Sequence, residues 1–148
     1  MITGRFGDTT TSPYIEASVH LPRLRIRGYV SFLVDTGASG SVLMPADAKK
    51  LGVNFGRLIH PTTSHGIGGF SEGFNEVAVV GFSDGKHVYG FDIELEIAKR
   101  TKDNQHLPSL LGRDILNRCR LVADHTRKLL TLTPRRWDFR VALRGRRY

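Results

Sequence analysis

The sequence predicts a single, mostly β domain, and three features of the chain lead to this prediction. Several short apolar or alternating segments have strand spacing and end at glycine, proline or Asp-Gly turns. The chain contains 16 glycines, which indicates many turns. Its length of 148 residues is typical of one domain that is large enough to bury its own hydrophobic core.

The expected strands follow one another along the whole body of the chain. They occupy residues 15–21, 27–34, 41–43, 57–60, 76–82, 88–97, 110–112, 121–123 and 129–132. The segment 88–97 alternates apolar residues with Asp92, Glu94 and Glu96, which predicts one buried face and one exposed face. Residues 83–85 and 124–127 separate pairs of strands as hairpin turns, because Asp and Gly tolerate the backbone conformations that such turns need.

Two short helices and two loops complete the expected body of the domain. Pro45 begins a helix over residues 46–51, with Gly52 just beyond its end. Residues 113–119 fit a second short helix. We expect the glycine-rich residues 62–74 to be mobile, and the polar residues 99–106 to form a loop.

Positive charge is concentrated at the C-terminal end of the chain. The formal net charge is +8, and residues 135–148 contain six arginines but only one acidic residue, Asp138. This pattern favours a solvated basic tail, and the alternative is a weak contact with nucleic acid or an acidic surface. Because Trp137, Phe139 and Tyr148 lie in the same segment, we expect part of it to pack against the body.

We therefore divide the chain into an N-terminal segment at 1–14, a domain at 15–133 and a basic tail at 134–148. Cys119 is the only cysteine, so an intrachain disulfide is excluded and a reducing compartment is favoured. The N-terminus lacks the apolar core of a signal peptide, and no apolar run is long enough to span a membrane. These features predict a cytoplasmic protein. The scattered histidines predict no metal site, and we expect no cofactor.

One motif has the properties of a catalytic carboxylate. An apolar run leads directly into Asp35, which is followed by Thr36 and Gly37 and then by two small residues, Ala38 and Ser39. The apolar approach controls the ionisation of a carboxylate, the tight turn exposes it, and small neighbours let a second backbone come close. The alternative is that Asp35 only ends a strand and caps an ordinary turn.

Three separate blocks together resemble retropepsin-like aspartic proteases, the single-domain branch of the pepsin-like enzymes. Residues 33–39, Leu-Val-Asp-Thr-Gly-Ala-Ser, are similar to the catalytic loop of that family. Residues 66–70, Gly-Ile-Gly-Gly-Phe, are similar to its flap tip. Residues 110–116, Leu-Leu-Gly-Arg-Asp-Ile-Leu, are similar to the segment that supports the catalytic loop. The blocks occur in the order typical of the family, and the resemblance extends over about residues 15–133.

The resemblance implies an all-β fold, namely a closed, mostly antiparallel, barrel-like acid-protease fold with one or two short helices. It also implies an aspartic endopeptidase that hydrolyses peptide bonds with a water molecule activated by two aspartates. Since pepsin-like enzymes need two catalytic aspartates and this chain offers one Asp-Thr-Gly motif, the implied active site lies on the axis of a homodimer. The expected substrate is a peptide or protein.

The resemblance also implies a role for each residue of the catalytic loop. Asp35 would be the catalytic carboxylate that acts on the water molecule. The hydroxyl of Thr36 would bond to the partner's loop and hold both aspartates in place. The backbone of Gly37 would approach the peptide and accept a hydrogen bond from a substrate N–H group.

Five further residues are expected to bind substrate. Ala38 would line the cleft, and Ile67, Gly68 and Gly69 would form the flap tip that covers the peptide. The alternative for these flap residues is a glycine-rich loop without function. Leu110 would form a wall beside the scissile bond, although it could equally pack only into the core.

One position departs from the viral members of the family. Their Asp-Thr-Gly-Ala run is followed by an acidic residue that pairs with the arginine of the third block. Here Ser39 stands at that position, so Arg113 lacks this acidic partner. We therefore expect weak, concentration-dependent dimerisation. The same departure supports an alternative, in which the chain is a non-catalytic dimerisation or peptide-binding module.

Overall fold

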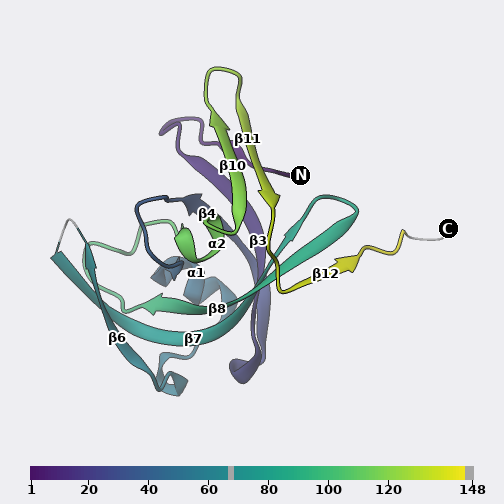
Figure 1. Ribbon diagram of the computed structural model, residues 1–148. Helices are drawn as coiled ribbons and strands as arrows, with labels where there is room; N and C mark the ends of the chain where they lie inside the picture. The colour runs from purple at the N-terminus through teal and green to yellow at the C-terminus, as the bar shows by residue number, and fades with distance from the viewer. Residues whose placement is uncertain (67–68, 146–148) are drawn as a thin grey trace.

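Strands dominate the fold, as the sequence predicts (Figure 1). The structure is a computed structural model that describes residues 1–66 and 69–145. The strands are β1 (Ile2–Thr3), β2 (Arg5–Phe6), β3 (Pro13–Leu21), β4 (Ile26–Val34), β5 (Val42–Leu43), β6 (Pro61–Gly66), β7 (Gly69–Ser83), β8 (His87–Ala98), β9 (Leu110–Leu111), β10 (Cys119–Asp124), β11 (Leu129–Pro134) and β12 (Phe139–Ala142). The helical elements are α1 (Pro45–Leu51), α2 (Arg113–Leu116) and the 3₁₀ turns η1 (Pro22–Leu24) and η2 (Phe55–Arg57).

Six strands close into a barrel within the described part of the chain. Each strand pairs with the next in the order β8, β5, β9, β4, β3 and β7, and β7 pairs back with β8. In this ring, the pairs β4–β9 and β5–β8 are parallel. The pairs β5–β9, β3–β4, β3–β7 and β7–β8 are antiparallel. This arrangement confirms the predicted closed, mostly antiparallel barrel. No helix among residues 1–66 and 69–145 is long and apolar enough to cross a bilayer.

The core of the barrel follows from alternation along its long strands. In β3, every second residue from Ile15 to Leu21 is buried, so one face of the strand points into the barrel. Phe82 of β7 and Phe91 of β8 meet edge to face with ring centroids 5.8 Å apart. These fully buried rings and the aliphatic residues around them supply the apolar burial that stabilises the fold.

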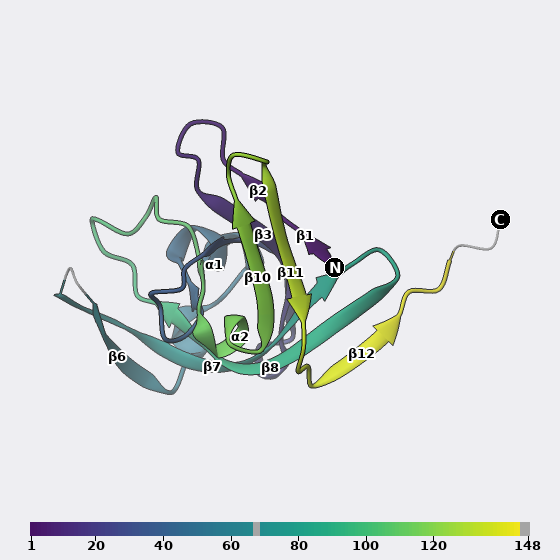
Figure 2. The ribbon, with the colours of Figure 1, turned by 45° about the horizontal axis from the view of Figure 1, so that its top comes forward.

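A smaller sheet in the order β1, β11, β10 stands beside the barrel (Figure 2). Ile2 pairs with Leu132, so the start of the chain is joined to its C-terminal hairpin. Ile2, Leu130 and Leu132 are buried and belong to the main hydrophobic core. The small sheet is therefore built within one chain and is continuous with the packing of the barrel.

The prediction of a strand at residues 57–60 is wrong. Arg57, the first residue of this segment, is the last residue of η2. The side chain of Asn54 caps η2 by accepting a hydrogen bond of 3.0 Å from the N–H of Gly56. β6 begins only at Pro61. The local cap therefore favours a turn where apolar composition alone suggested a strand.

Two other predictions need a change of boundary or type. The glycine-rich residues 62–74 are mostly paired strand, because β6 and β7 form a hairpin with Gly66 opposite Gly69. The second helix ends at Leu116, three residues earlier than predicted, because Cys119 already begins β10. In both places, strand pairing supplies the hydrogen-bond partners of the backbone N–H and C=O groups: β6 pairs with β7, and β10 pairs with β11.

Glu96 is also not exposed, although the alternation of β8 predicted an exposed position. Only 9% of its surface is accessible, and its carboxylate accepts a hydrogen bond of 2.8 Å from Ser64 Oγ on β6. Pairing of β5 beside this end of β8 covers the strand further. Tertiary packing therefore buries both faces of β8 near its end and supplies the polar partner that a buried carboxylate needs.

Part of the basic tail packs against the body, as its aromatic residues led us to expect. β12 pairs with β8, and the ring of Trp137 meets Tyr89 edge to face with centroids 5.1 Å apart.

Asp138 accepts hydrogen bonds from Arg118, at 3.0 Å, and from the N–H of Asp92, at 2.7 Å. Both hydrogen bonds lower the pKa of Asp138, and the bond from Arg118 has the larger effect. The contact between Asp138 and the body therefore weakens only when the pH falls through that lowered pKa. Tyr148 lies outside the described residues.

We expect the Cys119 thiol to react slowly in the folded protein. It is half-buried, and burial raises its pKa from about 9 to about 11. At pH 8 the reactive thiolate is therefore about a hundredfold scarcer than in the unfolded chain. Alkylation by iodoacetamide, followed by mass spectrometry, should be slower by about this factor in native protein than in urea. Equal rates in the two states would contradict the prediction.

Candidate active site

The loop that carries Asp35 begins where β4 leaves the barrel. β4 pairs in parallel with β9, and Val34 lies opposite Leu111. The N–H of Asp35 donates to the carbonyl oxygen of Leu111 at 3.0 Å, so the strand pairing continues to the aspartate itself. The buried strands therefore determine where the carboxylate emerges from the barrel.

The Thr-Gly turn then orients this carboxylate. The N–H of Gly37 donates to Asp35 Oδ1 at 2.9 Å, and the N–H of Ala38 donates to the carbonyl oxygen of Asp35 at 3.2 Å. Asp35 is half-buried, whereas Thr36 and Gly37 are exposed. The turn thus presents one oriented carboxylate at the surface of the chain, next to backbone that a second molecule can approach.

Gly112 supports the loop from the other side through an unusually close backbone contact. A Cβ atom at this position would lie 2.4 Å from both the carbonyl carbon and the carbonyl oxygen of Gly40. The N–H of the next residue, Arg113, donates to the carbonyl oxygen of Ala38 at 2.8 Å. Only glycine therefore allows β9 and the start of α2 to lie directly against the loop.

Ser41 and Asp114 connect the end of this loop to α2. Ser41 Oγ donates to Asp114 Oδ1 at 2.7 Å, and the N–H of Ser41 donates to Asp114 Oδ2 at 3.0 Å. Ser41 Oγ also accepts a hydrogen bond of 3.0 Å from the N–H of Gly112. The buried hydroxyl of Ser41 and the carboxylate of Asp114 thus hold the end of the loop against the start of α2.

Arg113 binds a backbone carbonyl group in this chain. In the viral proteases, the corresponding arginine pairs with an acidic side chain instead. Its Nη1 donates to the carbonyl oxygen of Thr36 at 2.8 Å. This hydrogen bond fixes the peptide group between Thr36 and Gly37, immediately after the candidate catalytic aspartate. The guanidinium therefore positions the loop directly, without an acidic residue at position 39.

We expect replacement of Ser41 by Ala to destabilise the protein by about 2 kcal/mol, because the buried N–H of Gly112 loses its acceptor. Ser41→Thr keeps the hydroxyl and serves as the matched control. Urea unfolding followed by circular dichroism measures both variants. Equal stability of Ser41→Ala and the parent would show that the hydroxyl is dispensable.

The residues expected to contact substrate lie on several elements. Ala38 follows the Asp-Thr-Gly turn and is half-buried, and Leu110 is half-buried in β9 opposite Leu33 of β4. Gly69 is the first residue of β7, at the end of the β6–β7 hairpin. Ile67 and Gly68 lie outside the described residues. Ala38 and Leu110 are thus brought close to the Asp35 loop by the pairing of β4 with β9.

Sequence reasoning missed the polar support of the loop. The Gly-Arg-Asp run marked the segment that lies against the loop, but nothing in the pattern indicated that Asp114 binds Ser41 or that Arg113 binds the backbone of Thr36. These partners are separated by more than seventy residues along the chain. The short polar run of Ser39, Gly40 and Ser41 after the Asp-Thr-Gly-Ala motif offered no signal that distinguished Ser41 from its neighbours.

Comparison with known proteins shows that both the sequence and the fold are similar to those of aspartic proteases. The sequence model of the family described as aspartyl protease matches residues 23–115. These residues include the Asp35 loop, the β6–β7 hairpin and β9. The crystal structure of a retropepsin-like aspartic protease from Rickettsia conorii is similar with a TM-score of 0.56 and 26% identity, over 97% of this chain and 92% of that chain.

A second solved structure shows the same fold at lower sequence identity. EIAV protease, in complex with the inhibitor HBY-793, is similar with a TM-score of 0.52 and 23% identity, over 75% of this chain and 90% of that chain. No match was found among curated proteins. The fold of the chain is therefore retropepsin-like.

Proposed function

Because the chain belongs to the aspartyl protease family, we propose that it is an aspartic endopeptidase whose active site forms when two copies bring their Asp35 loops together. The main support is the geometry of this loop. One carboxylate is oriented by the N–H of Gly37, and the residues beside it are exposed on the surface of a single chain. Such a half-site becomes a pair of carboxylates when a twofold axis passes beside it.

The proposed chemistry is general acid–base catalysis by the two copies of Asp35. Two carboxylates held about 3 Å apart cannot both ionise cheaply, so the pair shares one proton. The ionised carboxylate removes a proton from a water molecule, and this water attacks the carbonyl carbon of the peptide. The protonated carboxylate donates to the carbonyl oxygen, and the pair then delivers a proton to the leaving amine.

The proposed dimer also suggests a role for the exposed Thr36. The carbonyl oxygen of this residue is held by Arg113 within its own chain, so the orientation of the peptide unit is already determined. We propose that the Thr36 hydroxyl bonds to the partner's loop, which would hold the two aspartates at a constant distance. Arg113 would thereby prepare each half-site for association.

The proposed substrate is an extended peptide with apolar side chains beside the scissile bond. Ala38 and Leu110 offer small and apolar walls next to the catalytic turn, and Gly37 offers a backbone carbonyl to a substrate N–H. The β6–β7 hairpin is proposed to cover the peptide and exclude water during hydrolysis, with Ile67, Gly68 and Gly69 as its proposed contacts to the substrate. Because the pair must keep one proton, we expect activity to be highest at acidic pH.

We expect the specific activity to rise with protein concentration, because each active site needs two chains. Position 39 carries a serine that cannot make the acidic pairing of the viral proteases, so dissociation should occur in the micromolar range. Sedimentation velocity and initial rates over the same dilution series measure the two quantities together. A tight dimer at about 1 nM protein would contradict weak association.

The alternative is a dimerisation or peptide-binding module without catalysis, and Ser39 is the observation that favours it. Purified protein that dimerises and binds peptides, but cleaves no member of a peptide library from about pH 3 to about pH 8, would support this alternative. Cleavage that stops with a statine-type inhibitor would instead support the protease.

A further inference from the structure

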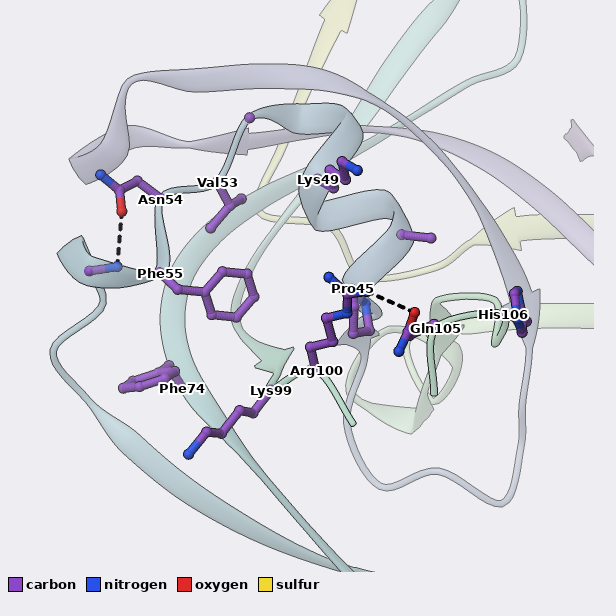
Figure 3. A pocket seen from close by; sticks show the side chains of 13 residues that line it. Pro45, Lys49, Val53, Asn54, Phe55, Phe74, Lys99, Arg100, Gln105 and His106 are labelled. Atoms are coloured by element: carbon purple, nitrogen blue, oxygen red, sulfur yellow. Dashed lines mark hydrogen bonds between the residues drawn. The ribbon is translucent and has the colours of Figure 1, made fainter. Parts of the chain in front are cut away.

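A cavity of about 1000 Å³ lies beside α1 (Figure 3). It is bordered by α1, η2, Phe74 near the start of β7, and the loop at residues 99–106. No residue of the Asp35 loop, β9 or α2 lines it. Its walls come from segments that are distant in the sequence, so only the folded chain forms it.

The inner side of this cavity is apolar. Val53, Phe55 and Phe74 line it, and all three are half-buried residues that pack against the hydrophobic core. Figure 3 shows that they come from separate places, with Val53 after α1, Phe55 in η2 and Phe74 on β7. Because their inner surfaces are anchored in the core, they provide a firm apolar surface for a side chain that enters from outside.

The rim of the cavity is basic. Lys49 on α1 and Lys99, Arg100 and His106 on the loop all line it, and all four are exposed. No aspartate or glutamate is among the lining residues in the part of the chain that the structure describes. The rim therefore attracts an anionic partner and repels a cationic one.

Two of these basic side chains have polar partners within the chain, one through a hydrogen bond and the other through an exposed ion pair. Arg100 Nη2 donates to Gln105 Oε1 at 2.9 Å within the loop. Lys99 Nζ lies 3.7 Å from Glu72 Oε2 on β7, in a pair whose two side chains are both 62% exposed. Such an exposed pair is weak, so Lys99 can exchange Glu72 for an acidic group of a bound molecule.

The cavity continues along the base of the β6–β7 hairpin. A second hollow of about 540 Å³ shares Phe74 and Lys99 with the first and is lined further by residues 61–63, 72 and 73. The two together form a longer depression. Its apolar inner side and basic rim belong to the first cavity, whereas the second hollow contains Glu72, the ion-pair partner of Lys99, as the one acidic residue among the described lining residues. This shape suits a length of polypeptide better than a compact small molecule.

We propose that this depression binds an acidic segment of a polypeptide, with one apolar side chain of that segment seated against Val53, Phe55 and Phe74. Its carboxylates would lie at the basic rim formed by Lys49, Lys99, Arg100 and His106. The inference rests on the proposed function in one respect, since it identifies the polypeptide as a part of the substrate outside the scissile region. Binding itself requires no catalysis.

The first test measures binding by the Asp35→Asn protein, which leaves a peptide intact. The probe is a short fluorescein-labelled peptide in which glutamate alternates with phenylalanine and leucine, and its fluorescence anisotropy reports binding. We expect saturable binding that weakens as salt rises from about 50 mM to about 500 mM. A peptide with serine in place of its apolar residues, or lysine in place of its glutamates, should bind at least about tenfold more weakly.

The chain offers a matched control for the rim. In the Lys49→Glu/Arg100→Glu variant we expect affinity to fall at least about tenfold. Lys50→Glu/Lys102→Glu makes the same change of net charge on the same helix and loop, but neither residue lines the cavity, so this variant should bind like its parent. Absence of binding, or equal loss in both variants, would overturn the proposal. Loss of binding in Arg140→Glu/Arg144→Glu alone would assign the contact to the basic tail and would also overturn it.

A second test separates failure of this site from failure of the proposed protease. The wild-type protein is given one cleavable peptide with and without an acidic, apolar extension. We expect the extension to lower KM, and the Lys49→Glu/Arg100→Glu variant to lose only this advantage while it cleaves the plain peptide at the parent rate. Equal KM for both peptides overturns the inference and leaves the protease intact. Absence of all cleavage contradicts the protease, and the anisotropy measurement then decides the binding site alone.

Discussion

Replacement of Asp35 by Asn is expected to lower kcat/KM for peptide hydrolysis at least about a thousandfold. Asparagine has the same shape, and its side-chain oxygen can still accept the hydrogen bond from Gly37. It cannot, however, remove a proton from water. Since the carboxylate is held at the end of β4 by backbone bonds, the variant should keep the stability of the parent. Rates with a peptide library and thermal unfolding measure the two effects.

Asp8→Asn is the matched control for this experiment, because Asp8 is an exposed aspartate in the turn before β3 and is not part of the Asp35 loop. It should cleave at the parent rate. If Asp8→Asn and Asp35→Asn retain equal activity, Asp35 has no catalytic role and the proposed function fails.

Mixing the two forms tests whether the site needs two copies of Asp35. An excess of Asp35→Asn protein should inhibit the wild-type protein, because mixed dimers contain a single carboxylate. The extent of inhibition should follow the fraction of mixed dimers measured by sedimentation. If the wild-type rate stays constant while mixed dimers form, one carboxylate is sufficient and the shared-proton mechanism is wrong.

Replacement of Gly112 by Ala is expected to destabilise the protein by about 3 kcal/mol and to displace the Asp35 loop. The added Cβ would lie 2.4 Å from the backbone of Gly40, and backbone atoms cannot rotate away as a side chain can. The backbone at Gly112 itself is extended, with φ of −100°, so alanine suits its conformation and the cost is steric. Urea unfolding measures the stability, and peptide hydrolysis measures the displacement of the loop.

Gly40→Ala tests the same contact from its other side. The nearest atom to a Cβ at Gly40 is Asp114 Oδ2 at 3.9 Å, which is an ordinary contact. This variant should therefore retain the stability and activity of the parent. If both substitutions cost the same, the crowding at Gly112 is not the cause, and the close approach of β9 to the loop is not required.

Local pattern determined much of the fold and the position of the candidate site. Alternation marked the long strands of the barrel, because a strand with one buried face repeats every two residues. Pro45 and Gly52 marked the ends of α1, and Gly52 indeed adopts a positive φ of 82° there. The apolar run before Asp35 indicated where a carboxylate leaves the core. Each of these signals lies within a few residues of the feature that it predicts.

Tertiary structure alone decided the burial of Glu96 and the partners that hold the Asp35 loop. Glu96 alternates like an exposed residue, but the β6–β7 hairpin brings Ser64 to it. Ser41 finds Asp114 only because β4 and β9 lie side by side. The basic cavity likewise combines α1, η2, β7 and a later loop. The sequence by itself determined features whose energetics are local, namely strand alternation, the ends of α1 and the Asp-Thr-Gly turn. Contacts between distant segments depend on how the barrel closes, and a linear pattern carries little information about that closure.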